Sequence, residues 1–271
     1  MITASAVGEK GFRMDDNVKA KWSRLAALGL FLAGLAPALM LAAVLIWGLD
    51  TEGETVFFLV TMVVAFLASF LVWRFGAWAK ILGLVAAAFM IMSLFWTAFG
   101  LAQPGSFFDF VPGLLVIPGA LIAIIAIIAS LIAKRRGHET TVAEGGEKRA
   151  IGIVLGVVVL AAAASGALHL LGRSTATATE GEVNVTLRDF AFDQQQYEVP
   201  GGVRLFVRND DPFFHTFTVE ELGIDEGFVG ASSKIVEIPD RPGTYVVYCK
   251  PHTADPEEPS EEDMAARITV T

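Results

Sequence analysis

The stretch YVVYCKPHTADPEEPSEEDMAARITVT, residues 245–271, decides how the carboxyl-terminal part of this chain is interpreted. It contains the only cysteine of the protein, Cys249, and His252 follows three positions later. Residues 244–248 are β-branched or aromatic, which is typical of a strand, and the Lys-Pro pair after the cysteine indicates a tight loop. A single cysteine excludes an internal disulfide and a CxxC redox pair. The thiol is therefore a core residue, a nucleophile or a metal ligand.

The sequence around this stretch has the alternating pattern of short strands with one buried face. Turn signals, such as PGG at 200–202 and NDDP at 209–212, separate the strands. We expect seven or eight strands over residues 181–271, which is typical of a β-sandwich. The alternating apolar residues are Val183, Val185, Leu187, Val203, Leu205, Val207, Val236, Ile238, Ile268 and Val270.

Two further side chains complete a candidate metal-ligand set. His215 begins one predicted strand, and Met264 directly precedes the last one. A thiolate, two imidazoles and a thioether are the ligands of a trigonal copper site with a long axial bond. A cysteine protease also uses a Cys–His pair, but a histidine in a tight loop beside Cys249 suits a shared ion better than proton abstraction.

Residues 181–271 resemble a cupredoxin, the plastocyanin and azurin type of blue-copper domain. The resemblance covers about a third of the chain and rests on three motifs: NDDPFFHTFT at 209–218, GTYVVYCKPH at 243–252 and MAARITV at 264–270. It implies an all-β Greek-key sandwich that holds one type 1 copper ion. The ligands that it implies are His215, Cys249, His252 and Met264.

The resemblance also implies one-electron transfer rather than conversion of a substrate, with His252 as the edge through which electrons pass. Two departures from the family pattern stand out. Eleven residues, many of them acidic, separate His252 from Met264, so a carboxylate of Glu262 or Asp263 is an alternative axial ligand. Thr216 stands where relatives often have Asn, and its hydroxyl can still tie the two ligand loops together.

The first 172 residues have the composition of a membrane protein. Hydrophobic residues make up 54 % of the chain, and five stretches without any charge are long enough to cross a bilayer. We therefore predict a helical membrane domain over residues 25–172, after a tail of residues 1–24 and before a linker of residues 173–180. The five predicted spans are Leu25–Leu49, Thr55–Trp73, Ile81–Leu101, Phe110–Ala133 and Ala150–Gly172.

Basic residues predict the orientation of these spans, because cytoplasmic loops are enriched in Lys and Arg. The tail, the second loop and the fourth loop carry the basic residues, whereas the first and third loops have none. We expect a multi-pass protein of the cytoplasmic membrane whose amino terminus is cytoplasmic and whose copper domain is extracytoplasmic. The basic residues are Lys10, Arg13, Lys19, Lys21, Arg24, Arg74, Lys80, Lys134, Arg135, Arg136, Lys148 and Arg149.

The predicted spans themselves contain no Asp, Glu, Lys or Arg, so they do not resemble an ion or proton pathway. His169 is expected to be a polar residue at the membrane interface. Gly152 and Gly156 form a GxxxG motif, which is a weak sign of close helix packing. We expect these helices to be an anchor or a docking surface for a partner.

Two functions from different classes fit these features. The first is electron transfer between membrane-associated redox partners, such as cytochromes or oxidase components. The second is copper homeostasis, in which an anchored domain senses, stores or delivers copper. A third, a degenerate cupredoxin used only for binding, is disfavoured by the intact His, Cys and His. The net charge of −9 makes nucleic acid an unsuitable partner.

Overall fold

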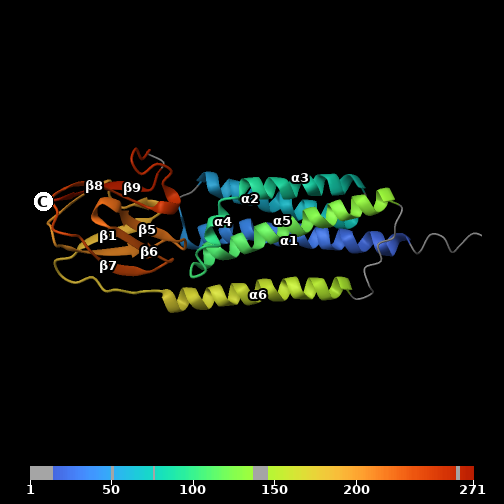
Figure 1. Cartoon of the computed structure of the whole chain (residues 1–271), viewed down its shortest axis with the longest axis horizontal. Coiled ribbons are helices and arrows are strands. Elements are labelled where there is room, and N and C mark those ends of the chain that lie inside the picture. The colour runs from blue at the N-terminus through green and yellow to red at the C-terminus, as the bar shows by residue number, and fades with distance from the viewer. Residues whose placement is uncertain (1–14, 50–51, 76, 137–145, 261–262) are drawn as a thin grey trace, which may run out of the picture. The chain divides into compact units, whose positions relative to one another are not determined.

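The computed structural model describes residues 15–49, 52–75, 77–136, 146–260 and 263–271. In this part of the chain, six helices precede a β-sandwich (Figure 1). The helices are α1 (Asp15–Trp47), α2 (Glu52–Arg74), α3 (Ala77–Ser93), α4 (Thr97–Gly100), α5 (Phe107–Arg136) and α6 (Gly146–Gly172). The order of helices first and strands second agrees with the fold class predicted from the sequence.

The chain divides into two compact units, and the boundary cuts through the long helices. The first unit contains residues 1–38, 59–95 and 114–159. The second contains residues 39–58, 96–113 and 160–271, so it includes one end of several helices together with the whole sandwich.

Four of the helices are long and apolar enough to cross a membrane: the segments Trp22–Trp47, Thr55–Arg74, Phe107–Arg135 and Ile151–Gly172. Large apolar side chains such as Leu67, Ile125 and Leu160 are exposed on them. Such side chains are stable in lipid, and a helix satisfies its own backbone hydrogen bonds there. The four helices therefore indicate insertion into a membrane.

The third predicted span, Ile81–Leu101, is not one continuous helix. Helix α3 begins earlier, at Ala77, and ends at Ser93, and its apolar part is shorter than the four spans above. Helix α4 follows after a turn, and within and just after α4 the N–H groups of Phe99 and Leu101 donate hydrogen bonds to carbonyls only three residues back. A Cβ atom on Gly100 would come within 2.2 Å of the Asp109 carbonyl oxygen, so this glycine lets the turn approach the start of α5.

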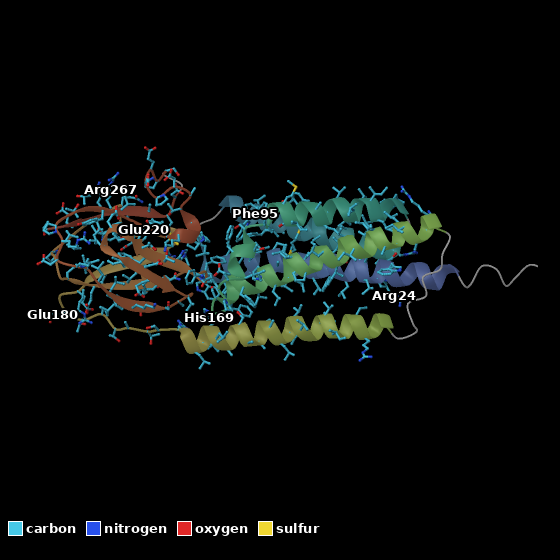
Figure 2. All side chains as sticks on the ribbon, in the orientation of Figure 1. Arg24, Phe95, His169, Glu180, Glu220 and Arg267 are labelled. Atoms are coloured by element: carbon cyan, nitrogen blue, oxygen red, sulfur yellow. The ribbon has the colours of Figure 1, made fainter. Side chains whose placement is uncertain are left out.

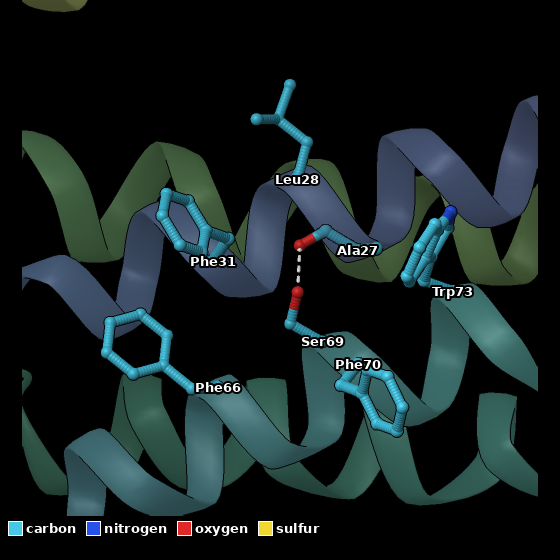
Figure 3. Close-up of a pocket in the computed structure, with 7 residues that line it drawn as sticks. All are labelled: Ala27, Leu28, Phe31, Phe66, Ser69, Phe70 and Trp73. Atoms are coloured by element: carbon cyan, nitrogen blue, oxygen red, sulfur yellow. Dashed lines mark hydrogen bonds between the residues drawn. The ribbon is translucent and has the colours of Figure 1, made fainter.

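Small residues also allow close helix packing in the first unit. Gly29 of α1 and Gly119 of α5 face each other, and a Cβ on either would lie within 2.7 Å of the other residue's carbonyl oxygen. Between α1 and α2, the Ser69 hydroxyl donates a 2.8 Å hydrogen bond to the Ala27 carbonyl oxygen beside a small apolar groove (Figure 3). By contrast, the GxxxG motif of α6 is not packed against a described residue, since a Cβ on Gly152 would meet nothing within 4 Å.

The sandwich consists of two sheets, with strand orders β2-β1-β4-β7 and β3-β9-β8-β5-β6. Two pairings, β1 with β4 and β3 with β9, are parallel, and the others are antiparallel. The strands are β1 (Val183–Arg188), β2 (Ala191–Phe192), β3 (Gln196–Val199), β4 (Arg204–Asn209), β5 (His215–Val219), β6 (Ile224–Phe228), β7 (Ser233–Glu237), β8 (Gly243–Tyr248) and β9 (Ala265–Val270).

The alternating apolar residues of the sequence form the core of this sandwich. Val185, Leu187, Leu205, Val207 and Ile268 are each at most 1 % exposed and belong to one continuous cluster. Cys249 and Met264 belong to the same cluster. The period-2 pattern therefore identified the buried face correctly.

We expect Gly119→Ala to destabilise the helical part of the protein, because the added methyl group would overlap the α1 backbone. Overpacking of this kind typically costs about 1–3 kcal/mol. Thermal unfolding of the full chain in lipid nanodiscs measures the effect. Gly152→Ala is the matched control, since alanine is the better helix former and meets no neighbour there. Equal unfolding temperatures for the two variants would contradict the close α1–α5 contact.

Candidate metal centre

Two adjacent strands of the second sheet position the three candidate ligands. His215 is the first residue of β5, and Cys249 directly follows β8, which pairs with β5 through Thr218 and Tyr248. A short 3₁₀-helix, η2 (Lys250–His252), then turns the chain so that His252 returns toward Cys249. The backbone N–H of His252 donates a 3.0 Å hydrogen bond to the Cys249 carbonyl oxygen, which fixes this turn.

The three side chains converge on one point. The Cys249 Sγ atom lies 3.3 Å from His252 Nδ1 and 3.6 Å from His215 Nδ1, and the two Nδ1 atoms are 3.2 Å apart. Cys249 and His215 are fully buried, whereas His252 is half-buried. Among the described residues, these three form the group of ligand atoms that is able to hold one metal ion.

A buried carboxylate holds the first histidine in place. The Nε2 atom of His215 lies 2.7 Å from Asp211 Oδ2, and both side chains are completely buried. The opposite ring nitrogen, Nδ1, is thereby directed toward Cys249 and His252. Sequence analysis did not single out Asp211, although its position four residues before His215 in the motif DPFFH was visible.

Asp211 also stabilises an unusual turn beside the site. Its two carboxylate oxygens accept hydrogen bonds from the backbone N–H groups of Asp189 (2.9 Å) and Phe190 (3.1 Å). These two residues have positive φ angles of 55° and 57°, a backbone conformation that is unfavourable for residues other than glycine. The turn places the Phe190 ring against His252, with 5.0 Å between the ring centroids. One carboxylate therefore positions both a ligand and the aromatic ring that covers the site.

The charges of this group are set by burial and by hydrogen bonds. Burial opposes ionisation of Asp211, but the hydrogen bonds from His215, Asp189 and Phe190 outweigh it and lower the pKa of this carboxyl. Burial also disfavours the charged form of His215, yet its bonds to Asp211 and Cys249 raise its pKa to about 9. Burial, followed by the nearby charge of His215, lowers the pKa of His252 to about 3. Asp211 is therefore an anion next to the metal group.

Thr216 connects the two ligand loops, as the sequence predicted. Its hydroxyl oxygen accepts a 2.9 Å hydrogen bond from the backbone N–H of Lys250. Its own backbone N–H points at the Cys249 sulfur, 3.3 Å away. A hydrogen bond to a thiolate stabilises its negative charge, so Thr216 orients the sulfur and moderates its basicity.

Met264 lies next to the group, at the start of β9. Its side chain is 1 % exposed. The Cys249 N–H donates a 2.9 Å bond to the Met264 carbonyl oxygen, and the Met264 N–H donates a 3.0 Å bond to that of His252. These backbone bonds hold Met264 beside Cys249 and His252. Met264 as an axial ligand stays a prediction.

Of the two alternative axial carboxylates, Asp263 belongs to the described residues. Both oxygens of Asp263 accept hydrogen bonds within the loop, from the backbone N–H groups of Ala254 and Ser260 and from the Ser260 hydroxyl. These bonds lower the pKa of Asp263. Glu262 is outside the described residues.

His169 is not a member of the metal group. It is near the end of α6 (labelled in Figure 2), and its Nδ1 atom lies 3.2 Å from the Gly105 carbonyl oxygen. This contact is consistent with the structural role expected for it.

Comparison with known proteins supports the interpretation of the strands as a cupredoxin-like domain. Residues 154–257 match the family model described as "Cupredoxin-like domain". No curated protein matches the chain.

Among solved structures, an oxidised mutant of amicyanin is 15 % identical, covering 36 % of this chain and 90 % of that one, with a TM-score of 0.29. A copper-containing nitrite reductase from Thermus scotoductus SA-01 is 18 % identical, covering 37 % of this chain and 26 % of that one, with a TM-score of 0.27. The family match and the geometry described above together show that this chain carries a cupredoxin-like domain after an N-terminal helical region.

Proposed function

We propose that this protein is a membrane-anchored type 1 copper protein that transfers single electrons on the extracytoplasmic side of the membrane. The observation that carries this proposal is the convergence of His215 Nδ1, Cys249 Sγ and His252 Nδ1 within 4.8 Å of one another in a cupredoxin-like domain. A soft thiolate with two imidazoles suits copper, which would supply a couple between Cu(II) and Cu(I).

The residues around the ligands favour electron transfer because they hold the ligand geometry fixed. Asp211 fixes the ring of His215, and Thr216 fixes Cys249 relative to the neighbouring loop. Ligands that cannot move when the charge of the ion changes keep the reorganisation energy small. We propose Met264 as the axial ligand, since its backbone is bonded to both Cys249 and His252.

The same burial argues against the alternative of copper delivery. His215 and Cys249 are 0 % exposed, so an ion could leave only if the ligand loops opened. A delivery site exchanges its ion with a partner and needs exposed ligands. His252 is the partly exposed ligand, so we propose it as the path by which electrons enter or leave.

The distribution of Lys and Arg in the loops between the predicted spans supports the proposed extracytoplasmic position, which requires that the shorter apolar helix Trp78–Ser93 also crosses the membrane. The domain has 19 acidic and 7 basic residues from Ser174 onward. A negative surface attracts positively charged partners and accelerates their association. We propose a basic, membrane-associated redox protein as the electron acceptor.

The first prediction concerns the thiolate. We expect the purified full chain to bind one copper ion and to show the intense visible absorption of a copper–thiolate bond, and Cys249→Ser to lose that absorption completely. Metal analysis and visible spectroscopy after Cu(II) loading measure both properties, with circular dichroism as the control for folding. A parent protein that folds but shows no visible band would refute the proposed type 1 site.

The second prediction concerns the axial position. Replacement of Met264 by Leu should keep the visible band but raise the reduction potential, because a donor that also stabilises Cu(II) is lost. Redox titration monitored by the visible band gives the potential. Met92→Leu is the control, since Met92 is on α3 and 77 % exposed. An unchanged potential in Met264→Leu would remove this residue from the ligand set.

The third prediction concerns the carboxylate behind His215. In Asp211→Asn, we expect a higher reduction potential, because a buried anion next to the ligand stabilises Cu(II) more than Cu(I). Loss of such a partner typically weakens metal binding by about 10–100-fold. Copper affinity by competition with a chelator and the potential by redox titration are the two measurements.

Asp210→Asn is the matched control for this variant, since Asp210 is adjacent but partly exposed and paired with Arg208. If both variants had the same potential and affinity, Asp211 would have no specific effect on the site.

A further inference from the structure

The second compact unit contains a cavity of about 770 Å³ that reaches the proposed copper ligand His252. Its walls come from the end of α1, the start of α2, the α4–α5 turn and the loops around the metal group. All of these residues belong to the same unit. The cavity is thus in direct contact with the one ligand that we propose as the path for electrons.

The cavity lies at the ends of two of the apolar spans. Phe57 and Phe58 are in the first turn of one apolar span, and Phe108 and Asp109 are in the first turn of another. Trp96 and Phe99, which also line the cavity, have the amphipathic or aromatic character of residues at a membrane interface. A molecule dissolved in the bilayer would reach the cavity at this end of the spans.

The lining combines aromatic rings with the polar side chains of Thr97, Gln103, Asp109, Lys250 and His252. Only the Oδ2 atom of Asp109 accepts hydrogen bonds from described residues, namely from the Phe214 N–H (2.7 Å) and from the Ser106 hydroxyl. Its Oδ1 atom accepts none from the residues that the structure describes. On the other side, His252 directs Nδ1 to the metal group, and its Nε2 atom has no partner in that same set.

These features define the class of ligand. Apolar cavities of this size with a few polar groups are typical sites for small molecules. Aromatic walls favour a planar ring, and the two free polar atoms favour hydroxyl groups on that ring. A lipid acyl chain would leave both polar atoms unpaired. We infer that the cavity binds a lipid-soluble hydroquinone, which is the electron donor of the proposed copper site.

The inferred reaction rests on the proposed function and balances in two one-electron steps. In the first, one hydroxyl O–H bond would break: its proton would pass to the Asp109 carboxylate, its electron would pass through His252 to a bound Cu(II) ion and give Cu(I), and a neutral semiquinone would remain. An external one-electron acceptor restores Cu(II), and Asp109 releases its proton to water. In the second step, the semiquinone loses its remaining hydroxyl proton and one electron in the same way and leaves as the quinone.

The first test is binding to the metal-free full chain in detergent, with a decyl-substituted 1,4-benzohydroquinone as the probe and calorimetry as the readout. We expect saturable binding at one site. Ala102→Trp, which places a large side chain in the cavity lining, and Asp109→Asn should each weaken binding at least about tenfold. Asp255→Asn removes a carboxylate that does not line the cavity and should bind the probe like the parent.

The second test is the rate at which the visible band of the copper-loaded protein is bleached by the same hydroquinone. We expect bleaching in Asp109→Asn to be slower by about a hundredfold, as is typical for loss of a proton acceptor. Reduction by ascorbate, which is water-soluble and needs no cavity, should be unchanged in this variant. Ala102→Trp keeps the carboxylate. This variant should also slow bleaching by the hydroquinone, while the rate of bleaching by ascorbate should stay unchanged.

The two tests separate this inference from the proposed function. Failure to bind copper would refute the copper site, while calorimetry on the metal-free protein still decides whether the cavity takes a hydroquinone. The inference is overturned if the metal-free protein does not bind the probe, or if Ala102→Trp binds it as tightly as the parent. It is also overturned if n-decanol, which has the chain but no ring, displaces the probe at equal concentration.

Discussion

The carboxylate of Asp211 is the constraint on which the candidate metal centre depends. It is completely buried, and a buried anion is stable only if hydrogen bonds compensate the loss of water. His215 and the backbone N–H groups of Asp189 and Phe190 provide those bonds. The same bonds hold a strained turn, orient a ligand and place an aromatic ring over His252. A single buried charge thereby connects the first sheet to the metal group of the second.

The acidic insertion illustrates how a long loop is accommodated without changing the site. Its ends are fixed by the backbone bonds between Met264 and both Cys249 and His252, while Asp263 closes the loop on itself through Ala254 and Ser260. Loop length costs little free energy when the ends are already held by a rigid sheet. The ligand loop of a cupredoxin-like domain can therefore carry extra residues and still return a methionine to the core.

The helical region has more than the role of an anchor in the function that we propose. Its outer turns contribute aromatic rings and the Asp109 carboxylate to a cavity that includes His252. In a copper domain with an open ligand edge, any protein of suitable charge can dock there. When the exposed copper ligand, here His252, faces such a cavity instead, the site selects an electron donor that dissolves in the bilayer. This arrangement gives a physical reason for joining the two parts in one chain.

The sequence by itself determined the apolar helices, the alternating strands and the residues His215, Cys249 and His252, because each depends on local periodicity or on a short spacing such as Cys-x-x-His. It did not reveal the break between α3 and α4, because residues 81–101 contain no charged residue or proline that would mark it. Nor did it reveal the role of Asp211 or the cavity. Aspartates are abundant in this acidic domain, and only tertiary contacts distinguish the buried Asp211 from its partly exposed neighbour Asp210. Which groups meet across distant segments is decided by packing, and packing is not visible in spacing alone.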